Sequence, residues 1–498
     1  DLFSYVEIIK QLVTYDDNMY DNLVETKEIN NIINTVKICD ISVGSGHFLV
    51  SALNRIIYIK KYLGVLFKYG KNELLTEYDI DIIDDVLHVF NGQGKLFFYD
   101  KDNSLSQIVQ ETLFNEKRII IENCIYGVDL NSKAVAICQL RLWIELLKNA
   151  YYKNGIMETL PNIDINIKVG NSLVSKLEFS IGKKIGGNNL GLEQNTIRSI
   201  NQYKKLVASY KATSDKAQKS EIKRQISSIK DYLHGIYSQI RLVMDNENNT
   251  IIDYGDTTGL YTNAFEWAIE FPELLTEKGE FMGFDCVVGN PPYGLLNKKQ
   301  NQNTSISVSS AVLGYYKENV NYQPAKGGVL NIYRLFICRC FELLRPKGHC
   351  CLIFPLAFMC DSTNAAIRKY VMENTQIDFI EAFPERDNES KRVFKEVKMS
   401  VCILGATKKR VDESYRFKVR IHGDNYVDEN NETMNISYKE IKTIDNEYCS
   451  IPLIRDSELA VFLKMTSKAD RMKKYSKCYT GEIDISLDKK YITTSSED

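Results

Sequence analysis

Asn290, Pro291, Pro292 and Tyr293 follow an apolar run and combine three useful chemical properties. Asn290 offers a side-chain carbonyl oxygen as a hydrogen-bond acceptor. The prolines fix their own φ angles and push Asn290 out of the helical region, so the turn is stiff and its backbone carbonyls have set directions. Tyr293 adds a flat ring beside these acceptors. These groups can bind an exocyclic amine on a planar ring, such as the N6 amine of adenine, although a β-turn after a core strand explains the same residues.

Gly44 and Gly46 lie between an expected strand at residues 36–40 and a long helical pattern of apolar residues. A strand, a glycine turn and a helix start form the nucleotide-binding corner of a doubly wound sheet. The glycines let a ligand approach the backbone, and the free N–H groups of the helix start favour an anionic group. The spacing matches neither Gly-x-Gly-x-x-Gly nor the phosphate loop, which disfavours dinucleotides and ATP. An ordinary tight turn is the alternative.

Two more polar residues end expected strands. Residues 119–129 predict a strand that ends at Asp129, where a carboxylate can accept hydrogen bonds from ribose hydroxyls. A helix-capping role for Asp129 is an equal alternative. Residues 163–174 predict a third strand and turn, in which Asn171 can read an adenine edge or simply form the turn.

The composition excludes several classes of protein. Hydrophobic content of 44% and charged content of 26% over 498 residues are typical of a soluble globular chain. No apolar run reaches the roughly 18 residues that a membrane span needs. The twelve cysteines contain no Cys-x-x-Cys pair and the five histidines are scattered, so we expect a cytoplasmic protein with reduced thiols and no metal.

Strand and helix patterns alternate, which predicts an α/β fold with a doubly wound, mostly parallel sheet. Residues 86–90 and 95–99 predict a β-hairpin, and residues 398–408 and 415–421 predict two antiparallel strands that close the sheet. Because the chain starts at Asp1 rather than Met, we expect a fragment of a longer protein. The expected divisions are a helical segment at 1–36, half of the sheet at 37–174, a helical insertion at 175–264, the second half at 265–424, and a separate domain at 425–498.

Four stretches in order resemble the motifs of S-adenosylmethionine-dependent DNA amino-methyltransferases: 40–48, 126–129, 170–173 and 290–293. The match is best for adenine-N6 enzymes of the type IIG restriction-modification kind, in which cofactor motifs precede the catalytic motif and a target-recognition domain follows. The resemblance covers roughly residues 37–410, with insertions. It implies a seven-stranded methyltransferase sheet, and it implies that residues 425–498 begin a target-recognition domain.

The resemblance also implies a role for each motif residue. The cofactor-binding residues, for the methionine part, the ribose and the adenine in turn, would be Asp40, Gly44, Gly46 and Phe48, then Asp129, then Asn171. The catalytic residues would be Asn290, Pro291, Pro292 and Tyr293. Asn290 and the Pro291 carbonyl would accept hydrogen bonds from the target amine. Tyr293 would stack on a flipped base, with Phe394 on its other face.

Double-stranded DNA is the partner that the resemblance implies, but the net charge of −2 gives no global attraction to it. Residues 391–424 contain ten Lys or Arg and four Asp or Glu. We therefore predict that basic residues there, such as Arg416 and Lys418, contact DNA phosphates. A solvated face is the alternative explanation for such a charge run.

Two departures from the family pattern leave alternatives open. An aromatic Tyr-Thr-Pro motif does not precede the glycine loop, and Ile41 stands where many relatives have Pro. No nuclease motif is evident, so cleavage would need a fused or separate nuclease and specificity module. The other functions are methylation of cytosine N4, RNA or protein glutamine, or DNA binding by an inactive specificity subunit.

Overall fold

A computed structural model of the chain describes residues 23–153, 155–157, 166–175, 194–213, 215–247, 260–261, 263–297, 305–468 and 475. Nine strands form one sheet in the order β15-β14-β12-β13-β11-β8-β1-β4-β7. The strands of its first half are β7 (Ile167–Val169), β4 (Ile125–Asp129), β1 (Ile38–Asp40) and β8 (Phe284–Gly289). The strands of its second half are β11 (Leu344–Pro355), β13 (Val401–Thr407), β12 (Gln376–Phe383), β14 (Arg416–Ile421) and β15 (Thr433–Ser437).

The predicted α/β fold with a doubly wound, mostly parallel sheet is confirmed. β13 is antiparallel to β11 and β12, and β15 is antiparallel to β14, whereas the other neighbours are parallel. The sheet has nine strands rather than the expected seven, because β14 and β15 extend it beyond β12. The strands predicted at 398–408 and 415–421 form as β13 and β14 and run antiparallel to each other, but they are not neighbours, since β12 lies between them and pairs with β14 in parallel.

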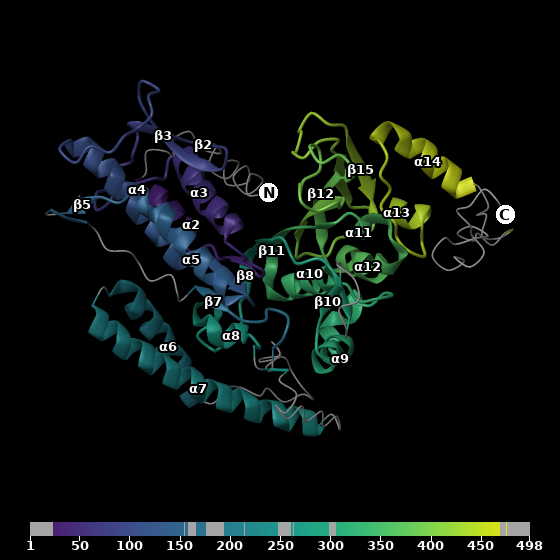
Figure 1. Ribbon diagram of the computed structural model, residues 1–498, viewed down its shortest axis with the longest axis horizontal. Coiled ribbons are helices and arrows are strands. Elements are labelled where there is room, and N and C mark those ends of the chain that lie inside the picture. Colours follow the sequence, from purple (N-terminus) through teal and green to yellow (C-terminus); the bar gives the residue numbers. More distant parts are fainter. Residues whose placement is uncertain are drawn as a thin grey trace, which may run out of the picture.

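Helices cover both faces of this sheet (Figure 1). One face packs on helices that connect the strands of the first half, α3 (His47–Tyr62), α4 (Ser104–Asn123) and α5 (Ser132–Leu147), together with α2 (Leu23–Ile33). The other face packs on α8 (Trp267–Glu270), α10 (Ile332–Leu343), α11 (Ala357–Cys360) and α12 (Ala365–Asn374). Successive residues of β1 alternate between the two cores, because side chains of a strand alternate between faces: Ile38 belongs to the first core and Cys39 to the second.

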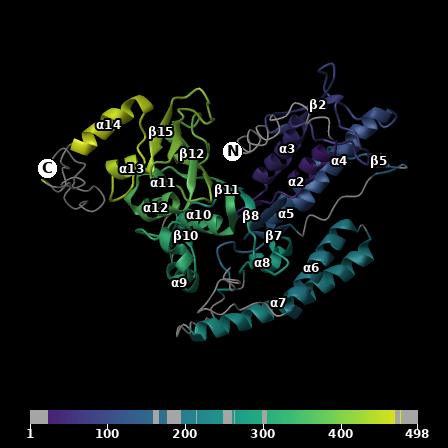
Figure 2. The ribbon, with the colours of Figure 1, turned by 180° about the vertical axis from the view of Figure 1, so that it is seen from behind.

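Two long helices form a hairpin beside the sheet, α6 (Gln194–Ala212) and α7 (Lys216–Glu247) (Figure 2). Ile200, Tyr203 and Val207 of α6 are buried with Ile222 and Ile226 of α7. Helices are therefore present within residues 175–264, where the sequence predicted a helical insertion. The hairpin packs its apolar stripe on α8 and the short helix η3 (Pro272–Leu274), which belong to the cover of the sheet.

Smaller elements complete the described chain. They are three two-stranded pairs, β2 (Tyr78–Ile83) with β3 (Val86–Asn91), β5 (Tyr152–Lys153) with β6 (Ile156–Met157), and β9 (Leu295–Asn297) with β10 (Ser305–Ser307), and the helices α9 (Ser310–Glu318), η4 (Val320–Ala325) and η5 (Ser362–Asn364). The hairpin predicted from 86–90 and 95–99 forms only a short antiparallel contact, in which Phe90 is bridged to Leu96 and the Phe97 N–H donates to the Val89 carbonyl at 2.8 Å. The main partner of β3 is β2, across a turn where Asp84 and Asp85 have positive φ.

The sheet continues past residue 424, where the sequence predicted a domain boundary. β14 and β15 lie on either side of that position and pair with each other. Two helices then pack beside β15, α13 (Tyr438–Ile444) and α14 (Asp456–Lys468). Residues 1–22 and 476–498, to which the sequence assigned a helix and part of a recognition domain, lie outside the described residues. Of the helices in the described ranges, none has the length and apolar content of a membrane span.

Candidate active site

Polar residues of three neighbouring parallel strands meet at one edge of the sheet. Asp40, the last residue of β1, is level with Gly127 of β4 on one side and Val288 of β8 on the other. Because these strands run in the same direction, their carboxyl ends face a common edge, which is where open α/β sheets bind ligands. Asp129 and Asn290 therefore follow at the same edge, one on each side of Asp40.

Asp40 is buried, with 1% of its surface exposed. Its Oδ1 accepts a hydrogen bond from the Ser42 N–H at 2.9 Å. Burial raises the pKa of the Asp40 carboxyl to about 7, the Ser42 N–H opposes this rise, and the charge of Asp129 adds to it. The carboxylate also lies against the backbone of Gly289, where an added Cβ would come within 2.7 Å of Oδ1.

The glycine turn after β1 is a loop that is hydrogen-bonded to Asp129. The Gly44 N–H donates to Asp129 Oδ2 at 2.9 Å, and the Val43 N–H donates to the Val128 carbonyl at 3.0 Å. Gly46 precedes α3 with φ of 82°, and a Cβ there would lie 2.5 Å from Cys138 Sγ. Glycine is therefore required at residue 46 both by its backbone conformation and by its close approach to α5.

Asn171 begins the turn that follows β7. Its N–H donates to the Asn263 carbonyl at 2.6 Å, and its Oδ1 accepts from the Leu173 N–H at 3.1 Å. The next residue, Ser172, donates its hydroxyl to the Ile41 carbonyl at 2.6 Å. The turn and the glycine loop are therefore joined directly, although 131 residues separate the two partners.

The Asn-Pro-Pro-Tyr segment leaves β8 beside the glycine loop. The Ser42 hydroxyl donates to the Asn290 backbone carbonyl at 3.3 Å. The half-buried Tyr293 hydroxyl lies 2.5 Å from Asn290 Oδ1 and 3.0 Å from the Ile353 carbonyl of β11. Because a hydroxyl has one hydrogen, it donates to one of these two acceptors at a time. Burial raises the pKa of Tyr293, so the hydroxyl is neutral at physiological pH.

Phe394 lies next to Tyr293. Their ring centroids are 6.5 Å apart and the rings are tilted by 58°. Both belong to a small apolar cluster with Ile353 and Phe383. The segment around Phe394 is basic, and its cations are Lys391, Arg392, Lys395 and Lys398.

Phe48 directly follows the glycine loop, whereas Arg416 and Lys418 lie on a strand near the far end of the sheet. Phe48 is the second residue of α3 and 42% of its surface is exposed. Arg416 starts β14 at the edge opposite Asn290, and its guanidinium bonds Glu440 at 3.0 Å. Lys418 is exposed in the middle of the same strand, level with Phe379. Their cofactor and DNA roles stay predictions.

Three residues of the site were missed from the sequence. Ser42 and Ser172 are next to motif residues, and a donor hydroxyl in each loop was the signal that could have identified them. Gly289 precedes Asn290, and its lack of a side chain leaves space for the Asp40 carboxylate. That requirement arises from a strand 249 residues away in the sequence, so local spacing carried no sign of it.

The buried Asp40 carboxyl predicts a pH-dependent effect of Asp40→Asn. Between pH 4 and 7 the folded protein holds a proton that the unfolded chain releases, so stability falls as pH rises through this window. Asn keeps the oxygen that accepts from Ser42 and carries no charge. The variant should be more stable than the wild type at pH 8, by at most about 4 kcal/mol, and this advantage should be about 2 kcal/mol smaller at pH 5.5.

Urea unfolding of both proteins at the two pH values measures this difference. An advantage of the same size at pH 5.5 and pH 8 would contradict a raised Asp40 pKa.

Two similar proteins are both named as type II restriction enzymes and methyltransferases. RM.Eco57I of Escherichia coli, a type II restriction enzyme and methyltransferase, is 22% identical over 415 residues, which cover 83% of this chain and 28% of that protein. RM.MjaORFECS2P of Methanocaldococcus jannaschii, whose name also describes a type II restriction enzyme and methyltransferase, is 22% identical over 410 residues and is likewise covered to 28%. The chain thus spans little more than a quarter of these relatives.

A solved structure and a family model also resemble this chain. The EcoKI M protein of a type I restriction enzyme aligns with 91% of this chain and 73% of its own, with a TM-score of 0.37 and 11% identity. The model of the Eco57I restriction-modification methylase matches residues 123–388, which is more than half of the chain and includes Asp129, Asn171 and Asn290 to Tyr293. The chain belongs to the Eco57I restriction-modification methylase family.

Proposed function

We propose that this protein transfers a methyl group from S-adenosylmethionine to the N6 amine of a flipped adenine in duplex DNA. The observation that carries the proposal is the contact between the glycine loop and the Asn-Pro-Pro-Tyr segment, made by Ser42 and the Asn290 carbonyl at 3.3 Å. It joins the residues assigned to the cofactor with those assigned to the amine. Methyl transfer requires the sulfonium and the target amine to be held side by side, so the residues that bind them must adjoin.

The residues of the first half fit S-adenosylmethionine by their charge. Asp40 and Asp129 are close enough for the charge of one to raise the pKa of the other. Two carboxylates at the glycine loop disfavour a phosphate and favour a ligand with cationic groups, and S-adenosylmethionine has an ammonium and a sulfonium. Asp40, Gly44, Gly46 and Phe48 would hold the methionine part, Asp129 the ribose and Asn171 the adenine.

Asn290 and Pro291 would act on the target amine. When bound, S-adenosylmethionine supplies a methyl group that is already activated by the sulfonium. The adenine amine is a poor nucleophile because its lone pair is delocalised into the ring. Hydrogen bonds from the amine to Asn290 Oδ1 and the Pro291 carbonyl would localise that lone pair and aim it, so positioning can supply several kcal/mol without a strong base.

Tyr293 and Phe394 would hold the flipped base. Extrusion of a base costs a few kcal/mol, and stacking returns about 1 to 3 kcal/mol per base. The two rings pack in one apolar cluster, which supports a shared role. A base entering between them would have to part the rings from their present separation of 6.5 Å. Pro292 would keep the segment stiff.

The basic segment around Phe394 supports duplex DNA as the substrate. It follows β12, whose carboxyl end lies at the same edge as Asn290. The activity of the whole protein, including any fused or separate nuclease and specificity module, is a further proposal, as is a cytoplasmic location. Methylation of cytosine N4 is the nearest alternative, because its amine has the same chemistry.

Replacing Asn290 with Ala tests the catalytic assignment. The rate of methyl transfer should fall at least about 100-fold, because the variant lacks the Asn290 Oδ1 acceptor and keeps only the backbone carbonyl of that residue. The full-length protein would be incubated with labelled S-adenosylmethionine and unmodified bacterial DNA, and digested nucleosides identified by mass spectrometry. Asn374→Ala, at the opposite edge of the sheet on α12, is the matched control and should retain activity. Label on cytosine N4 would overturn the adenine assignment, and an active Asn290→Ala variant would overturn the mechanism.

Salt dependence tests the DNA contacts. Replacing both Lys391 and Lys395 with Gln should reduce the slope of log K against log salt by about 2, because each lost phosphate contact removes about 0.9. Replacing Arg416 and Lys418 with Gln tests the contacts predicted from the sequence. If replacing either pair leaves the slope unchanged, that pair does not contact DNA phosphates and belongs to a solvated face. Filter binding of duplex DNA between 50 and 200 mM salt gives the slopes.

A further inference from the structure

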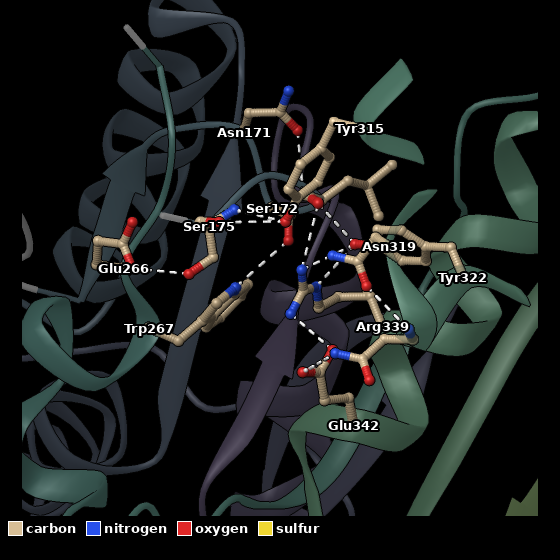
Figure 3. A network of polar contacts seen from close by, with 12 residues as sticks. Asn171, Ser172, Ser175, Glu266, Trp267, Tyr315, Asn319, Tyr322, Arg339 and Glu342 are labelled. Carbon is tan, nitrogen blue, oxygen red and sulfur yellow. Dashed lines mark hydrogen bonds and ion pairs between the residues drawn. The ribbon is translucent and has the colours of Figure 1, made fainter. Parts of the chain in front are cut away.

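The turn at residues 171–175 is held by side chains from distant parts of the chain (Figure 3). Trp267 Nε1 donates to the Ser172 carbonyl at 3.4 Å. The Tyr322 hydroxyl donates to the Leu173 carbonyl at 2.6 Å. The Tyr315 hydroxyl donates to the Ser175 carbonyl at 3.1 Å. Three successive side-chain contacts therefore set the position of a turn that contains no regular structure of its own.

A buried cation lies behind this turn. Arg339 of α10 is 2% exposed, and its Nη2 donates to the Leu173 carbonyl at 3.2 Å. Its Nη2 and Nε also donate to the Tyr322 oxygen, at 2.8 and 3.1 Å. Glu342 balances the charge, with its carboxylate 2.7 Å from Nη1. The Tyr322 hydroxyl is thus fully used, since it donates once and accepts twice.

Burial of a charged group is costly unless its geometry is well satisfied, so an apolar pair would hold α10 in place equally well. What an apolar pair cannot do is bind a backbone carbonyl. The arginine and the tyrosine both donate to the Leu173 carbonyl. The main effect of this network is therefore to fix the position of the turn rather than to fill the core.

The turn carries the residue assigned to the cofactor adenine. Asn171 Oδ1 accepts from the N–H of Leu173, the same residue whose carbonyl is held by Tyr322 and Arg339. The Asn171 side chain also hydrogen-bonds the Tyr316 hydroxyl, on the helix that carries Tyr315. A shift of the Leu173 peptide would therefore rotate the Asn171 amide.

We propose that Tyr322 and Arg339 are positioning residues for cofactor binding, which orient the Asn171 amide through the Leu173 carbonyl. They act on the affinity for the adenine of the cofactor and leave the transfer step itself to other residues. Tyr315 supports the far end of the same turn. The inference rests on the proposed use of S-adenosylmethionine, and it adds three residues that lie outside the four motifs.

Tyr322→Phe is the test, because it removes one hydroxyl with almost no change in volume. Titration calorimetry of the full chain should show a dissociation constant for S-adenosylmethionine raised about tenfold, in line with the loss of a buried hydrogen bond. The KM for the cofactor should rise in parallel, and kcat at saturating cofactor should change less than twofold. Tyr315→Phe should raise the dissociation constant by a smaller factor.

Tyr438→Phe is the matched control. Its buried hydroxyl donates to the Thr375 carbonyl at 3.0 Å and accepts from the Ile377 N–H at 3.0 Å, far along the sheet from the turn. It should lose thermal stability as Tyr322→Phe does and keep its cofactor affinity within twofold. Equal affinities in Tyr322→Phe and Tyr438→Phe would overturn the positioning role.

Hydrogen exchange separates this inference from the proposed function. Without any ligand, amides 172–175 should exchange faster in Tyr322→Phe than in the wild type or in Tyr438→Phe. Unchanged exchange would overturn the inference even if the cofactor binds. A wild type that binds no S-adenosylmethionine would overturn the proposed cofactor, while faster exchange in the variant would still establish the hold on the turn.

Discussion

The close approach of the Asp40 carboxylate to Gly289 sets the geometry of the central strands. A side chain at residue 289 would collide with Oδ1 at 2.7 Å, so β1 and β8 can end level only with glycine there. The level ends place the glycine loop beside the Asn-Pro-Pro-Tyr segment, and Ser42 then reaches the Asn290 carbonyl. The two halves of the site meet because the Asp40 carboxylate packs directly against the Gly289 backbone.

Charge is distributed differently in the core and at the site. The buried cations Lys60, Lys117 and Arg339 each have a glutamate partner within 4 Å. Asp40 is instead buried close to a second carboxylate, Asp129, so burial first and the charge of Asp129 second raise its pKa to about 7, against the opposing hydrogen bond from the Ser42 N–H. These three core cations are thus each paired with glutamate, whereas the edge where a cationic ligand would bind has two neighbouring carboxyl groups, of which Asp40 is only partly ionised near pH 7.

Much of the site was predictable because each motif marks the end of a strand. Glycine and proline punctuate the sequence locally, so the ends of β1, β4, β7 and β8 were located from residue types alone. The insertion of β12 between β13 and β14 was not predictable, because neighbours in a sheet are determined by contacts between distant strands. The apolar residues 119–121 were read as strand but end α4, since a short apolar run suits either structure.

By itself, the sequence determined the chemical groups of the site and their order: a carboxylate after the first strand, glycines before a helix, and an amide followed by two prolines and a ring. Those properties depend on residue type and on neighbours within a few positions. Only the tertiary structure decided what holds them. Tyr322 and Arg339 reach the Leu173 carbonyl across 149 and 166 residues, and Asp40 meets Gly289 in the same way. Such contacts exist only after the sheet brings distant segments together, so no local pattern records them.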